Sequence, residues 1–304
     1  MTEKVFRDTR TQIGILKSRG VIIKNKKFAK SVIRSTGYYN LINGYKDPFL
    51  KHNTAYEAYN AGTTIEEIYA LYEFDRKLRI LTLEFILELE KQVKALIAYT
   101  FSREHGHRDY LRIENFDSHG QKKYEQVCKL LSDLYKKISL NADKEPSVAH
   151  YVGGKNYVPL WVLVNAISMG DLSKLYSNMI QKERNEVARR LKWGVRENEL
   201  ESCLYFLSSI RTRCAHDERL YSFCSHVELR PNKYFSYFRS QSRKNYFAVL
   251  IAFKMLLTKK QFDEYAERLD NLFAELSSHL KSVHVNRIYR MMGIAKNWRK
   301  VSTL

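Results

Sequence analysis

One arginine and one histidine in the second half of the chain have side chains suited to phosphate chemistry. Arg211 and His216 lie five residues apart in the segment IRTRCAHDERLY, which closes an apolar run typical of a helix. Histidine titrates near neutral pH and can take or give a proton, and a guanidinium presents a fixed fork of donors to phosphoryl oxygens. Cleavage of RNA without a metal needs both functions, because protons move and negative charge builds on the phosphate. The pair therefore supplies half of a metal-independent ribonuclease site.

The spacing of this pair indicates how the rest of the site would be supplied. Five residues of a regular helix turn the two Cβ atoms about 140° apart, so one helix does not easily aim both groups at one phosphate. Either the helix ends between Arg211 and His216, or a second copy of the chain completes the site across a two-fold axis. The second alternative motivates the hypothesis of a homodimer.

The composition points to a polyanionic partner. The 304 residues include 52 Lys and Arg against 33 Asp and Glu, a net charge of +19, and RNA is the favoured partner for such a field. An anionic membrane is disfavoured, because the most apolar window, 246–253, is far shorter than the roughly 20 residues of a membrane span. Four cysteines without a C-x-x-C pair agree with a reducing compartment. We expect a soluble, cytoplasmic, RNA-binding protein.

Positive charge is segregated along the chain. The stretches 229–262 and 281–304 contain no acidic residue, and basic side chains also dominate the first 50 residues. This pattern predicts a basic surface built from both ends of the chain. The candidate RNA-binding residues are Lys24, Lys26, Lys27, Lys30, Arg34, Arg239, Arg243, Lys244, Arg287, Arg290 and Arg299. The tyrosines of STGYYNLINGY are expected in the core or an interface, and Trp161 and Trp298 as core or lid anchors.

The elements that must position these residues are predicted to be helices. Only 12 Gly and 4 Pro punctuate the chain, which favours an all-α fold. Apolar residues at three- and four-residue steps predict one helix of about 40 residues, starting at a capping box, either Thr63 with Glu66 or Thr64 with Glu67, and ending at Gly106. Shorter helices are predicted at about 120–140, 159–180 with an interruption near Gly170, 183–192, 197–215, 241–257 and 259–281.

The remaining segments are assigned by their turn residues. Loops are predicted from Pro146 to Gly154 and around Pro231, and 20–25 is the one candidate strand. No linker or repeat divides the chain, so we expect one domain. Its parts are a small basic N-terminal appendage at 1–62, a helical core with the Arg-x4-His motif at 63–230, and basic C-terminal helices at 231–304.

Five segments, in order, resemble one family. The segment IRTRCAHDERLY is similar to the R-N-x-C-A-H signature of the Abi-like (abortive infection) family, whose fold belongs to the HEPN superfamily of helical ribonucleases. RGVIIKNKKFAKSVIRSTGYYNLINGYKDPF resembles its N-terminal block, and YEFDRKLRILTLEFILELEKQVKALIAY its long central helix. VPLWVLVNAISMGDLSKLYSNM resembles its P-x-W…G-x-L-S block, and IYRMMGIAKNW its C-terminal ending.

The resemblance implies a HEPN-like helical bundle and a specific activity. Arg211 and His216 would be the catalytic pair of a metal-independent RNA endonuclease that needs no cofactor, a toxin-type effector of phage defence. Thr212 stands where the family usually has Asn, and its hydroxyl has less reach than an amide. A cognate structured non-coding RNA that restrains or guides the enzyme is the implied partner. The alternative is a non-catalytic RNA-binding scaffold or regulator with an idle site.

Overall fold

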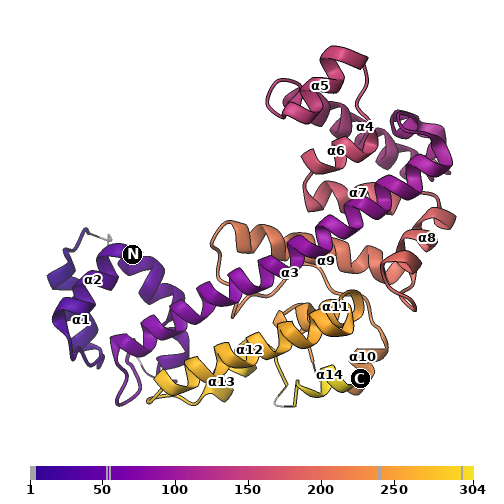
Figure 1. Ribbon diagram of the computed structural model, residues 1–304. Helices are drawn as coiled ribbons and strands as arrows, with labels where there is room; N and C mark the ends of the chain where they lie inside the picture. Colours follow the sequence, from indigo (N-terminus) through magenta and orange to yellow (C-terminus); the bar gives the residue numbers. More distant parts are fainter. Residues whose placement is uncertain (1–4, 53, 55, 239–240, 296) are drawn as a thin grey trace.

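The protein is built from helices around one long central helix. The computed structural model describes residues 5–52, 54, 56–238, 241–295 and 297–304, and across them it contains helices and two isolated β-bridges but no strand. Figure 1 shows the central helix crossing the molecule from one end to the other. The all-α prediction is confirmed.

The helices follow one another along the whole described chain. In chain order they are α1 (Thr9–Ser18), α2 (Lys26–Thr36), the π-helix η1 (Tyr39–Asn43), the 3-10 helix η2 (Asp47–Phe49), α3 (Ile65–His105), the 3-10 helices η3 (Asp109–Leu111) and η4 (Ile113–Asn115), α4 (Gln121–Asn141), α5 (Pro146–Lys155), α6 (Leu160–Ala166), α7 (Met169–Asn178), α8 (Gln181–Leu191), α9 (Glu197–Ala215), α10 (Lys233–Tyr237), α11 (Tyr246–Leu256), α12 (Lys259–His279), α13 (Val285–Met291) and α14 (Lys300–Thr303).

The central helix α3 has the start and the end that its sequence predicts. Of the two possible capping boxes the chain uses Thr64 with Glu67, and the 41-residue helix ends at Gly106, whose φ of 84° suits glycine. The side chain of Glu67 is buried and also accepts hydrogen bonds from the backbone amides of Lys281 and Ser282, each at 2.6 Å. The same carboxylate therefore starts α3 and holds the turn that follows α12.

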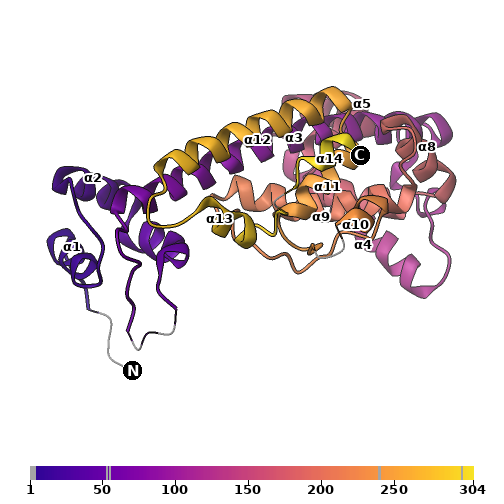
Figure 2. The ribbon, with the colours of Figure 1, turned by 90° about the horizontal axis from the view of Figure 1, so that it is seen from below.

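Helices from the whole chain surround α3. Helix α12 runs antiparallel along its first half (Figures 1 and 2), with ion pairs from Lys77 to Glu275 and from Arg268 to Glu84. The helices from α4 to α8 gather around its C-terminal half, and α1, α2 and η1 form a small N-terminal appendage beside its start. The long central helix and the appendage match the predicted architecture, and one continuous core runs from Ile13 to Val301.

The most apolar helix, α11, lies inside the protein. It begins at Tyr246, later than predicted, and only Lys254 among its eleven residues is not fully buried. The Tyr246 hydroxyl hydrogen bonds with those of Thr82 on α3 and Tyr265 on α12, so polar groups fix how three helices meet. No helix in the described parts of the chain is both long and apolar enough to cross a bilayer.

Several local predictions need correction. The predicted loop from Pro146 to Gly154 is helix α5, because proline at the first helical position loses no hydrogen bond and has a suitable φ. The predicted strand at 20–25 is reduced to one bridge between Ile22 and Thr64. The interruption predicted near Gly170 falls at 167–168, where a Ser168 capping box starts α7.

Two further predictions concern the segment around Pro231 and the positions of two tryptophans. The segment around Pro231 is a connection between α9 and α10, as predicted. Trp298 is a buried core residue, as predicted, whereas Trp161 is 48% exposed, so of the core and lid positions predicted for it only the lid position stays open.

Candidate functional site

His216 stands at the exact boundary where α9 stops. The last helical residue is Ala215, and the backbone amide of His216 still donates to the Thr212 carbonyl at 3.0 Å. Asp217 then takes a left-handed conformation with φ 57°, which turns the chain away from the helix axis. The imidazole of His216 is exposed. The helix thus ends between Arg211 and His216, but this ending does not bring the two side chains to one pocket.

A buried ion-pair network holds the segment that follows His216. Arg79 of α3 donates to Asp217 at 2.5 Å and to Asp75 at 2.7 Å, and both Asp75 and Arg79 are buried. Asp75 also accepts hydrogen bonds from the backbone amides of Leu220 at 3.1 Å and Tyr221 at 2.6 Å. The chain on the far side of His216 is therefore fixed to α3 by charge-assisted hydrogen bonds.

The surroundings of Asp75 act on the pKa of its carboxyl in opposite directions. Burial raises the pKa of the Asp75 carboxyl, while Arg79, the Tyr45 hydroxyl and the two backbone amides oppose that shift. The negative charge of Asp75 raises the pKa of Arg79 against the effect of burial. An ion pair surrounded by donors in this way is costly to break, because removal of one partner leaves the other charged and buried.

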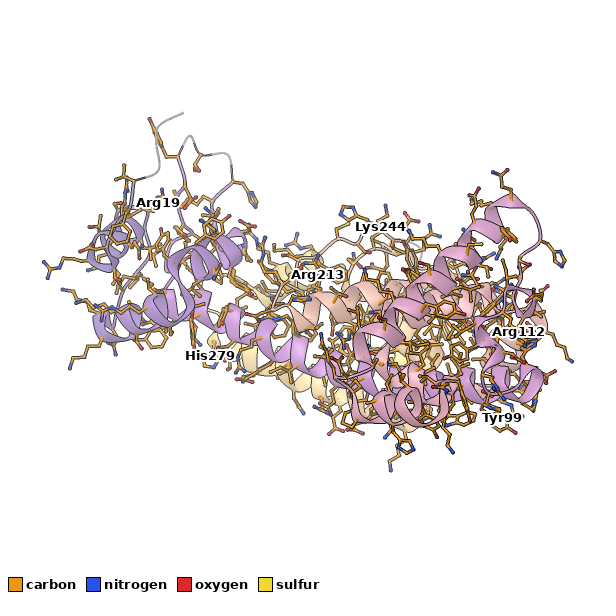
Figure 3. All side chains as sticks on the ribbon, turned by 90° about the horizontal axis from the view of Figure 1, so that it is seen from above. Arg19, Tyr99, Arg112, Arg213, Lys244 and His279 are labelled. Atoms are coloured by element: carbon orange, nitrogen blue, oxygen red, sulfur yellow. The ribbon has the colours of Figure 1, made fainter. Side chains whose placement is uncertain are left out.

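His216 lines a pocket shared by three parts of the chain. The pocket measures about 650 Å³ and lies between the end of α2, the π-helix η1 and the turn after α9. Its lining residues are Ser35, Thr36, Tyr39, Asn40, Asn43, Gly44, Tyr45, Tyr72, Arg213, His216, Asp217, Glu218 and Arg219. Figure 3 shows the labelled Arg213 at the waist of the molecule, between the N-terminal appendage with Arg19 and the far end with Arg112.

Two arginines are held at this pocket. Arg213 pairs with Glu218 at 2.9 Å and donates to the Arg219 carbonyl at 3.1 Å. Arg219 donates to the Gly44 carbonyl, at the end of η1, at 2.8 Å. The turn after His216 is consequently tied to η1 as well as to α3. Asp217 and Glu218, the two acidic residues that follow His216, pair with Arg79 and Arg213 and not with the imidazole.

Arg211 does not share this pocket within one chain. Its Nε lies 3.6 Å from an oxygen of the buried Glu90 on α3, whose other oxygen pairs with Lys94 at 2.7 Å. The Arg211 side chain keeps 36% of its surface exposed. Thr212 is exposed and donates its hydroxyl to the Ser208 carbonyl of its own helix at 3.1 Å. A single chain therefore brings Arg213 and Arg219 close to His216, and leaves Arg211 and Thr212 on other sides of α9.

The predicted basic residues of the N-terminal appendage form a free cationic face. Lys24, Lys26, Lys27, Lys30 and Arg34 are all exposed, and none forms an ion pair with another described residue. Three of them, Lys27, Lys30 and Arg34, line an open depression of about 600 Å³ together with Ser31 and Ser35. Because Ser35 also lines the pocket of His216, the two surfaces adjoin.

The predicted basic residues near the C-terminus are mostly engaged. Arg243 and Lys244 both pair with Glu228, and Arg299 pairs with Asp270. Arg287 donates to the Leu50 carbonyl at 3.4 Å and to the His52 ring at 2.9 Å, and it shares an open depression with Arg290. Arg239 lies outside the described residues.

The sequence analysis did not single out several residues of the site, although their positions in the sequence could have indicated them. Arg213 and Arg219 stand three residues on either side of His216, and Asp75 and Arg79 are polar residues inside the apolar periodicity of α3. Tyr45 is in the core, as predicted, but Tyr39 is 72% exposed. Burial raises the pKa of the Cys214 thiol to about 12, so this cysteine is a packing residue rather than a nucleophile.

Fold and site together define the class of protein. It is an all-α protein built on one long helix, with an Arg-x4-His motif at the end of a second helix that packs on the first. The sequence profile of the Abi-like protein family matches residues 31–222, which make up more than half of the chain, so the chain belongs to that family. The match includes the second half of α2, η1, α3 and the turn after α9, which line the pocket of His216. Comparison with curated proteins and with solved structures finds no match.

The Asp75 network leads to a prediction about the segment 217–221. We expect Asp75→Asn to lower the free energy of unfolding by about 3–5 kcal/mol, because the buried Arg79 would lose its buried partner and keep only the exposed Asp217. Hydrogen exchange at the amides of Leu220 and Tyr221 should become faster, as measured by mass spectrometry. Glu73→Gln, on the same helix, is the matched control. Unchanged exchange in Asp75→Asn would show that the carboxylate does not hold this segment.

Proposed function

We propose that the protein is a metal-independent RNA endonuclease of the HEPN type, acting in the cytoplasm as an abortive-infection effector. Membership of the Abi-like family suggests abortive-infection phage defence. The observation that carries the proposal is the exposed His216 at a helix end, in a pocket with two arginines that adjoins a face of unpaired cations. A ribose phosphate in this pocket would have a proton-transfer group and positive charge within reach.

The proposed chemistry assigns one role to each kind of side chain. His216 takes the proton of the 2′-hydroxyl, or gives one to the leaving 5′-oxygen, because an imidazole can accept and donate a proton. The guanidinium of Arg211 stabilises the charge that builds on the phosphoryl oxygens. Arg213 and Arg219 bind the neighbouring phosphates of the same strand. Thr212, exposed on α9, would contact the substrate or the partner chain.

A homodimer would bring Arg211 to His216. At 100° per residue, Ile80, Leu83 and Leu87 share one face of α3, next to the face whose Arg79 and Glu90 contact Asp217 and Arg211. Ile80 and Leu87 are 54% and 44% exposed. The open face of α9 carries the further residues Tyr205, Ser208, Thr212 and Ala215. We propose that these faces pack against a second copy about a two-fold axis. Arg211, at the edge of this surface, would then complete the site of the partner.

RNA is also the proposed regulatory partner. The net charge of +19 and the unpaired cations of α2 attract any RNA. We propose that a cognate structured non-coding RNA occupies this surface and restrains or guides the enzyme. The second candidate function is a non-catalytic RNA-binding scaffold, which is favoured by the position of Arg211 against Glu90, outside the pocket of its own His216.

The first prediction separates these two functions. Purified protein in EDTA should cleave mixed RNA to products that end in 2′,3′-cyclic phosphate, and His216→Ala should abolish this cleavage, because His216 is the one imidazole among the lining residues of the pocket. His226→Ala is the control, since His226 is an exposed histidine outside the pocket. Intact RNA with both the wild type and His216→Ala would favour the scaffold.

The second prediction concerns the shared site. Chains with Arg211→Ala and chains with His216→Ala should each be inactive as homodimers. A heterodimer purified through two different tags should recover about half of the wild-type rate, because one of its two sites has both groups intact. Recovery would not occur if Arg211 and His216 of one chain acted together, and a monomeric wild type in ultracentrifugation would contradict the shared site directly.

The third prediction concerns the free cations of α2. The triple variant Lys27→Gln, Lys30→Gln, Arg34→Gln should bind single-stranded RNA more weakly and lower the slope of log affinity against log salt by about 2, because three phosphate contacts are lost. A matched triple variant removes the same charge from Lys122, Lys129 and Lys136 on α4, far from α2 in Figure 1. Equal slopes in the two variants would refute a specific role for α2.

A further inference from the structure

The N-terminal appendage supplies one wall of the His216 pocket, and that wall is a π-helix. The π-helix η1 spans Tyr39–Asn43 and follows Gly37, whose φ of 82° breaks α2 in a conformation that suits glycine. Single π-helical turns are rare and occur often at functional sites. Two residues of this turn, Leu41 and Ile42, are fully buried, so η1 is anchored in the core. The other three face the pocket.

The side chains of the three pocket-facing residues of η1 make few contacts with the described part of the chain. The Tyr39 ring is 72% exposed and stacks on no other described aromatic ring. The side-chain amide of Asn43 is only partly exposed and has no hydrogen-bond partner within the described residues. Asn40 donates its amide nitrogen to the Thr36 carbonyl at 3.3 Å, and its side-chain oxygen accepts no hydrogen bond from the part of the chain that the structure describes. One aromatic face and two amides are thus presented to the pocket.

The wall is fixed relative to His216. Gly44, next to η1, accepts a hydrogen bond from Arg219, on the turn that follows His216. Tyr45 stacks on Tyr221 with ring centroids 5.6 Å apart and donates to Asp75, the same carboxylate that holds the amide of Tyr221. The π-helix and the turn after α9 are therefore held by one network. A ligand on Tyr39 would be positioned against the imidazole without further ordering of the backbone.

We propose that this pocket binds one unpaired nucleotide of an RNA strand, with its base stacked on Tyr39. This inference rests on the proposed function and names the substrate class of the same site. Exposed aromatic rings bind unstacked bases, and amides such as those of Asn40 and Asn43 can donate to and accept from the edge of a base. Arg213 and Arg219 carry the positive charge that a phosphate of that nucleotide needs.

The volume and the surroundings fit a nucleotide within a polymer. About 650 Å³ lies within the range of pockets for molecules of nucleotide size. The pocket opens through Ser35 onto the cationic face of α2, so the strand has a path of positive charge beyond the bound base. A base inside a duplex offers no free face to Tyr39. Tyr39 is accordingly a specificity-determining residue that selects unpaired RNA beside the scissile bond.

A stacking assay tests this assignment without relying on cleavage. In the His216→Ala background, a single-stranded RNA oligonucleotide that carries one 2-aminopurine should lose fluorescence when its base stacks on Tyr39. Tyr39→Ala should remove this quenching and weaken binding about ten-fold, the size of a lost base–aromatic stack. Tyr39→Phe should retain both, because the ring remains. A fully paired duplex with the same 2-aminopurine should show no added quenching.

The control is Tyr124→Ala on α4, a tyrosine that is 53% exposed and outside the pocket. Wild-type quenching and affinity in Tyr39→Ala would overturn the nucleotide pocket. A second measurement in the chain with intact His216 maps cleavage positions, which Tyr39→Ala should redistribute between paired and unpaired regions. Tyr39-dependent quenching without any cleavage would support the nucleotide pocket and contradict the nuclease. Cleavage at unchanged positions without Tyr39-dependent quenching would support the nuclease and contradict the nucleotide pocket.

Discussion

The carboxylate of Asp75 is the constraint on which the candidate site depends. A buried carboxylate is tolerated only if donors surround it, and here the donors come from three segments: Arg79 on the same helix, the Tyr45 hydroxyl beside η1, and the amides of Leu220 and Tyr221 after α9. Each segment must be in place for the carboxylate to be satisfied. The energy that favours the fold therefore also fixes the position of His216, which makes no hydrogen bond in this network itself.

The sequence predicts the positions of the helices better than it predicts the hydrogen bonds of Asp75. Apolar spacing and two capping signals define α3 to within two residues of its observed ends, because those signals are local. The partners of Asp75 outside α3 lie 30 and about 145 residues away along the chain, and no local pattern pairs them with it. Helix α5 was missed for a related reason, since Pro146 is compatible with a turn and with a first helical turn.

The same distinction between local and distant contacts applies to the charged residues. The spacing from Arg211 to His216 correctly indicates that one helix does not aim both groups at one point. Which cations are free is decided by acids elsewhere in the chain: Asp270 pairs with Arg299 across 29 positions, whereas 24–34 has no acidic residue of its own. Net charge predicts attraction to RNA, but only the folded chain distinguishes a paired arginine from an available one.

Under the proposed function, the position of Arg211 connects assembly with activity. In a single chain the Nε of Arg211 lies 3.6 Å from Glu90, which also pairs with Lys94. Because Glu90 shares its charge between two cations, it holds Arg211 less tightly than it would hold a single cation. The phosphate of an RNA strand bound beside His216 of a second copy would offer Arg211 a more concentrated negative charge than this shared carboxylate. The site would then be complete only in the assembled protein, whose strong positive charge by itself attracts RNA without selecting where it is cut.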